Sequence, residues 1–216
     1  MVRRSSPETR ASRARGLPGL ISLLVAVLAV CISAPPATAS QGVWEDLREG
    51  RGMVILYRHA LAPGGGDPSD FDVDDCSTQR NLSDAGRRQA RDMGDALRRN
   101  KVKVRRVFSS PWCRSRETAE LLELGPVRTM MRFGSTFTAP SAVTQRRESL
   151  AMRTIARQSD RSGVVIVSSH QANIVDLTGI APTSGEGIEE PHPNPSDKAC
   201  PSRGAITAGA AAEIGA

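Results

Sequence analysis

Four side chains near the ends of short apolar runs have the right chemistry to act on a phosphate group. They are Arg58, His59, Arg114 and His170. Two guanidiniums offer forked donors that match phosphate oxygens, and a neutral imidazole beside them can attack phosphorus. These residue types indicate a site that binds a phosphoryl group and accepts it on a histidine.

A parallel sheet would bring these four residues together. The apolar runs are short, continuous and rich in β-branched residues, so they predict buried strands at 53–57, 104–109 and 164–167. Periodic apolar positions predict helices from Ser83 onward and at 114–124, 148–158 and 171–177. This alternation predicts an α/β fold with three layers, α/β/α, and a mostly parallel central sheet. Ligands of such sheets bind at the carboxyl ends of the strands, where the four residues fall.

Residues 1–39 have the composition of an export leader. They hold five arginines and one acid, so they carry +4 of the formal net charge of +6. Their apolar run, 19–34, is shorter than the ~20 residues of a spanning helix and precedes Ala37-Thr38-Ala39, a small-x-small cleavage pattern. We expect a signal peptide that is cleaved after Ala39 and a secreted or periplasmic protein. The alternative is an uncleaved leader that anchors the protein in the membrane.

The sequence composition changes after Gly187. Beyond it, four prolines and a run of small residues replace any periodic apolar pattern. We expect a folded domain of residues 40–187, followed by an irregular tail of residues 188–216.

The basic charge does not predict nucleic-acid binding. Only +2 remains outside the leader, and aromatic residues make up 3% of the chain, so bases would have scarcely any stacking partner. A metal site on His59 and His170 is not expected either, because no third ligand has a suitable spacing. We expect a monomer without cofactor or metal, acting on a small phosphorylated substrate, with membrane contact only through an uncleaved leader.

Four segments of the chain resemble the characteristic segments of the histidine phosphatase superfamily, whose fold is like that of phosphoglycerate mutase. They contain the two histidine signatures, the helix start and the second arginine segment of that family. In family order, the matching segments are 56–60, 81–86, 109–119 and 166–179. The short connection between the arginine segment and the second histidine resembles the short, single-domain, exported phosphatases of the family.

This resemblance implies a role for each of the four residues. His59 would be the nucleophile that becomes phosphohistidine, with its second ring N–H held by a backbone carbonyl. Arg58, Arg114 and His170 would hold the phosphoryl oxygens, with His170 as a charged donor. The implied activity is that of a metal-independent, histidine acid-type phosphatase acting on a phosphomonoester or a phosphoramidate.

The proton donor for the leaving group departs from the family pattern. Gln171 stands where one branch of the family has an Asp, and residues 126–144 contain no acid. We expect Glu186, an acid flanked by glycines, to supply the proton. The other candidates are the loop acids Asp67, Asp74 and Asp75. Because the family's acid is absent from its usual positions, the alternative function is a catalytically weak phosphate-binding module of the same fold.

The cysteines of an exported protein can form disulfides. Among Cys76, Cys113 and Cys200, one pair can form and one thiol remains. In the fold that the resemblance implies, Cys76 and Cys113 flank the proposed pocket, so a disulfide between them would brace it. The alternative is two unpaired small residues.

Overall fold

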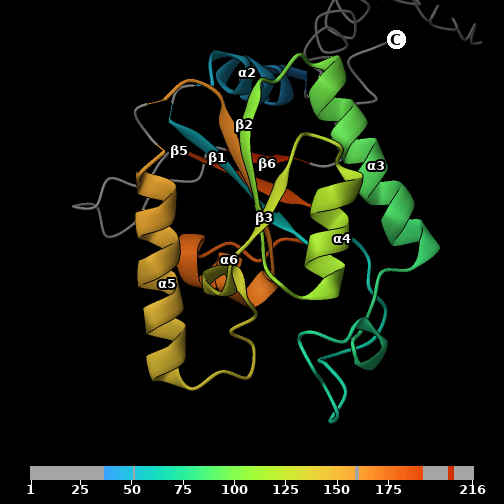
Figure 1. The fold of residues 1–216 in the computed structure, drawn as a ribbon. Helices are drawn as coiled ribbons and strands as arrows, with labels where there is room; N and C mark the ends of the chain where they lie inside the picture. The colour runs from blue at the N-terminus through green and yellow to red at the C-terminus, as the bar shows by residue number, and fades with distance from the viewer. Residues whose placement is uncertain (1–36, 51, 159–160, 192–203, 207–216) are drawn as a thin grey trace, which may run out of the picture. The chain divides into compact units, whose positions relative to one another are not determined.

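A six-stranded sheet with the order β3-β2-β4-β1-β5-β6 forms the centre of the fold (Figure 1). The strands are β1 (Met53–Arg58), β2 (Val104–Ser109), β3 (Val127–Thr129), β4 (Val164–Ser169), β5 (Gly187–Pro191) and β6 (Gly204–Ile206). All neighbouring pairs among β1 to β4 are parallel, whereas β5 runs antiparallel to both β1 and β6. The predicted mostly parallel sheet is confirmed.

The computed structural model describes residues 37–50, 52–158, 161–191 and 204–206. The chain divides into two units, Met1–Thr38 and Ala39–Ala216, and the sheet belongs to the second. The predicted signal peptide lies almost entirely outside the described residues. No helix in the described ranges is long and apolar enough to cross a membrane.

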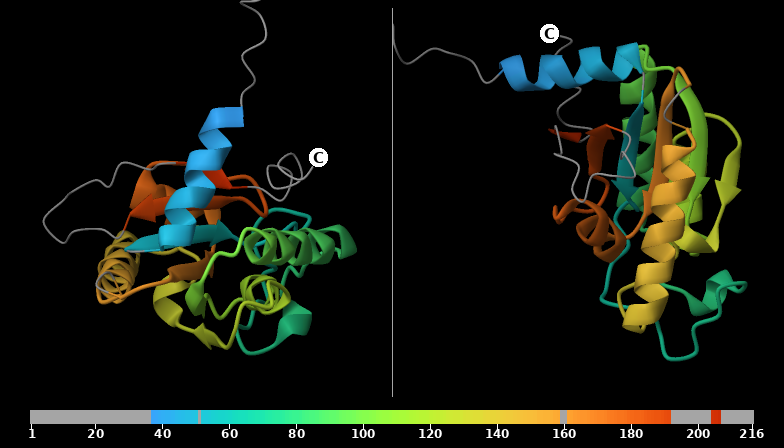
Figure 2. Two further views of the ribbon diagram at one scale, coloured as in Figure 1. Left: turned by 90° about the horizontal axis from the view of Figure 1, so that it is seen from above. Right: turned by 90° about the vertical axis from the view of Figure 1, so that its left-hand side faces the viewer.

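Helices cover both faces of the sheet, which confirms the three-layer α/β/α prediction. The α-helices are α2 (Ala37–Glu49), α3 (Asp84–Arg99), α4 (Cys113–Leu121), α5 (Ser141–Ala156) and α6 (Gln171–Thr178). Two short 3-10 helices are η1 (Cys76–Thr78) and η2 (Met131–Phe133). Helices α3 and α4 lie on one side of the sheet and α5 on the other (Figures 1 and 2).

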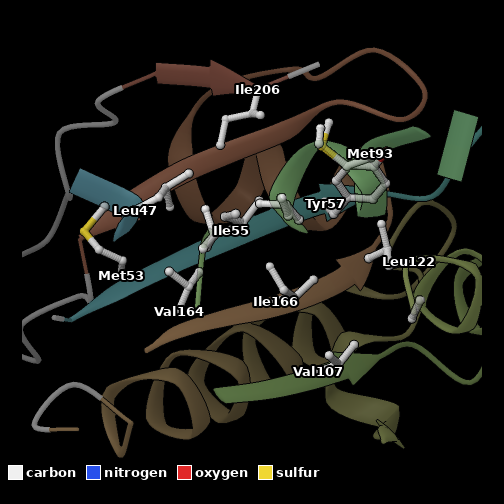
Figure 3. Close-up of a cluster of buried hydrophobic side chains, with 14 of the residues drawn as sticks. Leu47, Met53, Ile55, Tyr57, Met93, Val107, Leu122, Val164, Ile166 and Ile206 are labelled. Atoms are coloured by element: carbon white, nitrogen blue, oxygen red, sulfur yellow. The ribbon is translucent and has the colours of Figure 1, made fainter. Parts of the chain in front are cut away.

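Each face of the sheet has its own apolar core, because successive side chains of a strand point to opposite faces. On β1, Ile55 and Tyr57 pack in the cluster with α2, α3 and α4 (Figure 3). Val54 and Leu56 pack in the second cluster, with α5 and α6. Burial on both faces explains why the central strands are continuous apolar runs.

The expectation of an irregular tail from residue 188 is wrong for residues 188–191 and 204–206, which form β5 and β6. Ile188 is buried and pairs with Leu56 of β1. Backbone pairing with β1 supplies hydrogen bonds whatever the side chains are, so the strand needs little apolar sequence of its own. The remainder of the predicted tail, 192–203 and 207–216, lies outside the described residues.

Candidate active site

The structure brings all four predicted residues to one cavity. Arg58 ends β1 and is paired with Ser169 of the neighbouring parallel strand β4, which His170 follows directly. Arg114 lies in the first turn of α4, shortly after β2. Each therefore comes from the carboxyl end of a strand. The cavity has a volume of about 740 Å³, and we call it the active cavity.

His59 is held as a neutral imidazole. Its ring is buried, and Nδ1 lies 2.8 Å from the carbonyl oxygen of Ala60, to which it donates its proton. Burial lowers the pKa of His59 to about 3; the bond to Ala60 opposes that change, and the positive charges of Arg114 and other arginines add to it. The carbonyl thereby fixes the tautomer that leaves Nε2 with a free lone pair.

The backbone around His59 is tied on several sides. The His59 amide donates to Ser169 O over 2.9 Å, and the amide of Ala60 donates to Thr118 Oγ1 over 3.0 Å. The next residue, Leu61, accepts a bond from the amide of Ser83, the N-cap of α3. A Cβ on Gly86 would lie 2.2 Å from Leu61 O, so this close approach requires glycine.

His170 is neutral in this structure, contrary to its expected role as a charged donor. Burial lowers its pKa well below the usual value, and the neighbouring His59 and Arg114 lower it further. Its Nε2 lies 2.8 Å from Ser110 Oγ, which also accepts a bond from the amide of Trp112. The Ser110 hydroxyl has one proton and a second lone pair, so it can donate to Nε2 or accept from it, depending on the tautomer of His170. Nδ1 is buried and has no partner among the described residues.

Three guanidiniums line the active cavity, one more than the sequence indicated. Arg114 is 3% exposed, and Arg58 donates to the carbonyl of Pro182 over 2.8 Å. The third is Arg80, whose Nη1 donates to the carbonyls of Ala62 and Gly64, each over 2.7 Å. Arg80 stands immediately before the segment 81–86 that resembles the family's helix start, and the sequence analysis gave it no role.

The Asp67 carboxylate forms an ion pair with the Arg114 guanidinium. Its Oδ1 lies 2.5 Å from Arg114 Nη1, and its Oδ2 accepts from Arg114 Nη2 over 3.2 Å and from Trp112 Nε1 over 2.9 Å. Burial raises the pKa of Asp67, but the hydrogen bonds and charge of Arg114, together with Trp112, lower it below its usual value overall. Asp67 is therefore ionised and neutralises Arg114 in this state.

Glu186 does not line the active cavity, which goes against the expectation that it supplies the proton. Its carboxylate accepts from the amide and hydroxyl of Thr183, over 2.6 and 3.0 Å, within its own turn. Asp74 and Asp75 do not line the active cavity either. The acids in the lining are Asp67 and Asp176, and Asp176 accepts a bond from Thr136. The sequence analysis missed Asp176 because it lies inside α6 rather than at a strand end.

A disulfide joins Cys76 to Cys113, with 5.7 Å between their Cα atoms. It links the loop that carries Asp67 to the first turn of α4, next to Arg114. Gln79 Oε1 strengthens this link by accepting a bond from the Cys113 amide over 2.9 Å. Cys200 lies outside the described residues. Within the described ranges, no cluster of three His, Cys, Asp or Glu residues could hold a metal ion.

Comparisons with known proteins agree with this arrangement. The model of the histidine phosphatase superfamily (branch 1) matches residues 54–134. No curated protein is similar enough in sequence to match. Among solved structures, a mutant phosphoserine phosphatase from Entamoeba histolytica, in complex with phosphoserine, is 12% identical with a TM-score of 0.53, covering 73% of this chain and 98% of its own.

Two further structures are similar to this chain. The product of an open reading frame of Mycobacterium tuberculosis is 18% identical with a TM-score of 0.51, covering 72% of this chain and 96% of its own. The protein histidine phosphatase SixA, in complex with tungstate, is 17% identical with a TM-score of 0.49, covering 72% of this chain and 97% of its own. Residues 54–134, which include β1, α3, β2 and α4, are thus similar to the histidine phosphatase superfamily, and the chain shares its fold with the Entamoeba and Mycobacterium proteins.

Proposed function

We propose that the protein is an exported phosphatase that hydrolyses a phosphomonoester or a phosphoramidate through a phosphohistidine on His59. The observation that carries this proposal is the state of His59: buried, neutral and fixed by Ala60, in a cavity lined by three arginines. A neutral imidazole with one free lone pair is a nucleophile, and the guanidiniums offset the negative charge of the phosphoryl oxygens.

The reaction has two steps. In the first, the lone pair of His59 Nε2 forms a bond to phosphorus, and the bond from phosphorus to the leaving oxygen or nitrogen breaks. The leaving oxygen or nitrogen takes up a proton. Arg58, Arg114 and His170 hold the oxygens of the transferred group. In the second, water attacks phosphorus and gives a proton to the carboxylate that protonated the leaving group, the P–N bond breaks, and orthophosphate is released with His59 neutral again.

Asp67 is the acid that protonates the leaving group in this proposal. It lines the active cavity, and without substrate its carboxylate occupies both Nη groups of Arg114. A phosphoryl dianion that binds Arg114 displaces this carboxylate. The pKa of Asp67 then rises, because the bond to Arg114 is lost and a negative charge arrives nearby. Substrate binding itself thereby turns Asp67 into a proton donor.

The rim of the active cavity supports a substrate whose leaving group has a flat apolar face. The chain has seven aromatic residues, four Phe, two Trp and one Tyr, and three of them line this cavity. Phe71 stacks on Trp112 with 5.3 Å between ring centroids, and Phe137 is 72% exposed. An exposed aromatic at a cavity mouth can stack on a ligand ring.

Export is supported by the disulfide. Disulfides persist in the oxidising compartments outside the cytoplasm, where the predicted signal peptide would direct the chain. The Cys76–Cys113 bond at the edge of the active cavity is consistent with folding in such a compartment.

The test is hydrolysis of an aryl phosphate by the purified protein in EDTA, with and without His59→Ala. We expect turnover that survives chelation and disappears in the variant, with acid-labile label trapped on His59 during turnover. Loss of turnover on chelation would contradict the mechanism.

The alternative, a weak phosphate-binding module, is favoured by one observation, the carboxylate that already occupies Arg114. If Asp67 cannot be displaced, the phosphoryl group never reaches Arg114. Calorimetric titration of the same protein with orthophosphate, together with that assay, decides this: binding without any turnover supports the module and excludes the phosphatase.

A further inference from the structure

A second hollow, with a volume of about 330 Å³, is lined by residues of β2, β3, η2 and α5 and by residues directly before η2 and after α5, and we call it the arginine cavity. Five of its lining residues are arginines: Arg106, Arg128, Arg132, Arg157 and Arg161. Phe108, Met130, Thr154 and Gln158 complete the lining. None of these residues lines the active cavity.

The sheet itself places two of these arginines on one face. Arg106 and Phe108 are two residues apart on β2, so they share a face, and Arg128 of β3 is paired directly with Phe108. Phe108 packs in the cluster that contains α5 residues, so this face looks toward α5. The register between β2 and β4 shifts between Val104 and Arg106, an irregularity of the kind that redirects side chains.

The helix side of the arginine cavity adds neutral hydrogen-bonding groups. Arg132 donates to the hydroxyl of Thr154, and Arg105, from the irregular stretch of β2, donates to the side chain of Gln158. These bonds fix Thr154 and Gln158 in the lining without supplying negative charge. The guanidinium of Arg132 keeps further N–H donors, because each guanidinium has five.

The arginines of this cavity lack counter-charges. Among the described residues, none of the five forms an ion pair, and no acid lines the cavity. Asp160, adjacent to Arg161, lies outside the described residues and is the one acid between Glu148 and Asp176 in the sequence. Counted by charge alone, the five arginines outnumber this single acid. Like charges held together raise the free energy of the empty site, and a bound anion lowers that free energy by offsetting their repulsion.

We propose that the arginine cavity is a second anion-binding site, for a compact soluble polyanion that carries two or more phosphate groups. Five guanidiniums exceed what one orthophosphate dianion needs, and arginine forks match adjacent phosphates in pairs. Phe108 and Met130 give the hollow an apolar floor, on which a non-phosphate part of the ligand can rest. The site is concave and small, which suits a compact molecule rather than a flat lipid surface.

The test is calorimetric titration of the purified protein with inorganic triphosphate at low and high salt. The decisive variant is Arg128→Gln with Arg157→Gln, two exposed arginines that line the arginine cavity from β3 and from the C-cap of α5. The matched control is Arg88→Gln with Arg91→Gln, which removes the same charge from the exposed side of α3. Arg58→Gln separately disables the active cavity.

We expect two binding events in the unmodified protein. The R128Q/R157Q variant should weaken one of them by at least about tenfold, with a smaller salt dependence, because two charge-assisted contacts are lost. The control should bind within about twofold of the unmodified protein, since it keeps every cavity contact. Orthophosphate should compete well only at the event that R58Q removes.

Two outcomes would overturn the proposal. In one, both double variants weaken triphosphate binding equally, so that net charge rather than the arginine cavity explains it. In the other, triphosphate shows no event other than the one that R58Q removes, whether or not the protein binds anionic phosphatidylglycerol vesicles through these arginines. Aryl phosphate hydrolysis should be unchanged in R128Q/R157Q, which separates this test from that of the phosphatase.

Discussion

The active cavity and the arginine cavity are both lined by arginines, but they differ in burial and in partners. In the active cavity, Arg114 is 3% exposed and bound to Asp67, while Arg58 and Arg80 donate to backbone carbonyls. In the arginine cavity, four of the five arginines are exposed, and none has an ionic partner among the described residues.

This difference separates two uses of the same side chain. Guanidiniums fixed by backbone oxygens and a carboxylate are already oriented, so they can stabilise a transition state without moving. Exposed guanidiniums without partners lose conformational freedom when they bind, so they suit recognition of a highly charged ligand. Arginine content alone does not distinguish these uses; the partners do.

Replacing His59 should separate the two cavities most strongly, because it should abolish turnover in the active cavity and leave binding at the arginine cavity unchanged. Of the two cavities, only the active cavity contains the proposed nucleophile. We expect His59→Ala to lower kcat on an aryl phosphate by at least about 10³-fold, as for other covalent nucleophiles. Triphosphate binding at the arginine cavity should be unchanged, and calorimetry on the same variant measures it. Residual turnover close to that of the unmodified protein would contradict the assignment of His59.

Replacing Asp67 should have the next largest effect. We expect Asp67→Asn to lower kcat by about 10²-fold for an alkyl phosphate, since its leaving group needs a proton, and less for a nitrophenyl phosphate. Asp176→Asn is the matched control, because Asp176 also lines the active cavity but does not contact Arg114. Equal losses in both variants, or equal losses on both substrates, would argue against Asp67 as the acid.

Removing the disulfide should destabilise the side of the fold that carries Asp67. Cys76 and Cys113 are 37 residues apart, so their bond closes a long loop, and we expect Cys76→Ala with Cys113→Ala to lose about 4 kcal/mol of unfolding free energy. Chemical denaturation measures this loss. Reduced unmodified protein should behave like the variant; if it stays as stable as the oxidised protein, the disulfide does not brace the loop.

Acid should destabilise the protein through His59. Its pKa is about 3 in the folded state and about 6.5 in the unfolded state, so the unfolded state binds the extra proton between these values. Stability is therefore complete above pH 6.5 and falls on acidification toward pH 3, by about 1.4 kcal/mol per pH unit. Urea unfolding at several pH values tests this, and His59→Gln should show a shallower fall over the same window.

Arginine replacements in the arginine cavity should have the smallest effect on stability. We expect R128Q/R157Q to change the unfolding free energy by no more than about 0.5 kcal/mol, in the stabilising direction, because exposed like charges are removed. Thermal unfolding without ligand measures the change. A large destabilisation would mean that these arginines support the fold rather than a ligand.

The sequence was sufficient to predict what depends on local pattern. Arg58 and His170 follow strands whose apolar runs are continuous because both faces are buried, so the strand ends and the four residues at them could be located. Ser83 was predicted as the start of α3, and its side chain does accept a bond from the amide of Gly86 as the N-cap.

What depends on distant contacts could not be predicted. Asp67 reaches Arg114 only because its loop folds back onto α4, where the disulfide holds it, and nothing in the loop sequence distinguishes Asp67 from Asp74 or Asp75. Glu186 was expected in the cavity from its neighbouring glycines, but Thr183 captures its carboxylate locally. The arginine cavity was missed because its members come from segments that are far apart in the sequence.

The pairing of β5 with β1 protects β1, the strand that directly precedes His59, from exposure at the edge of the sheet. Because β4 and β5 flank β1 on both sides, the backbone that carries His59 is not an edge of the sheet. A chain cut before Gly187 would expose a buried, apolar strand as an unpaired edge, which is a template for pairing with another molecule. In the complete sheet, the amides of β1 should be among the last to exchange with deuterated solvent, because exchange there requires the largest opening. The short final strands therefore protect against self-association at the very strand on which the chemistry depends.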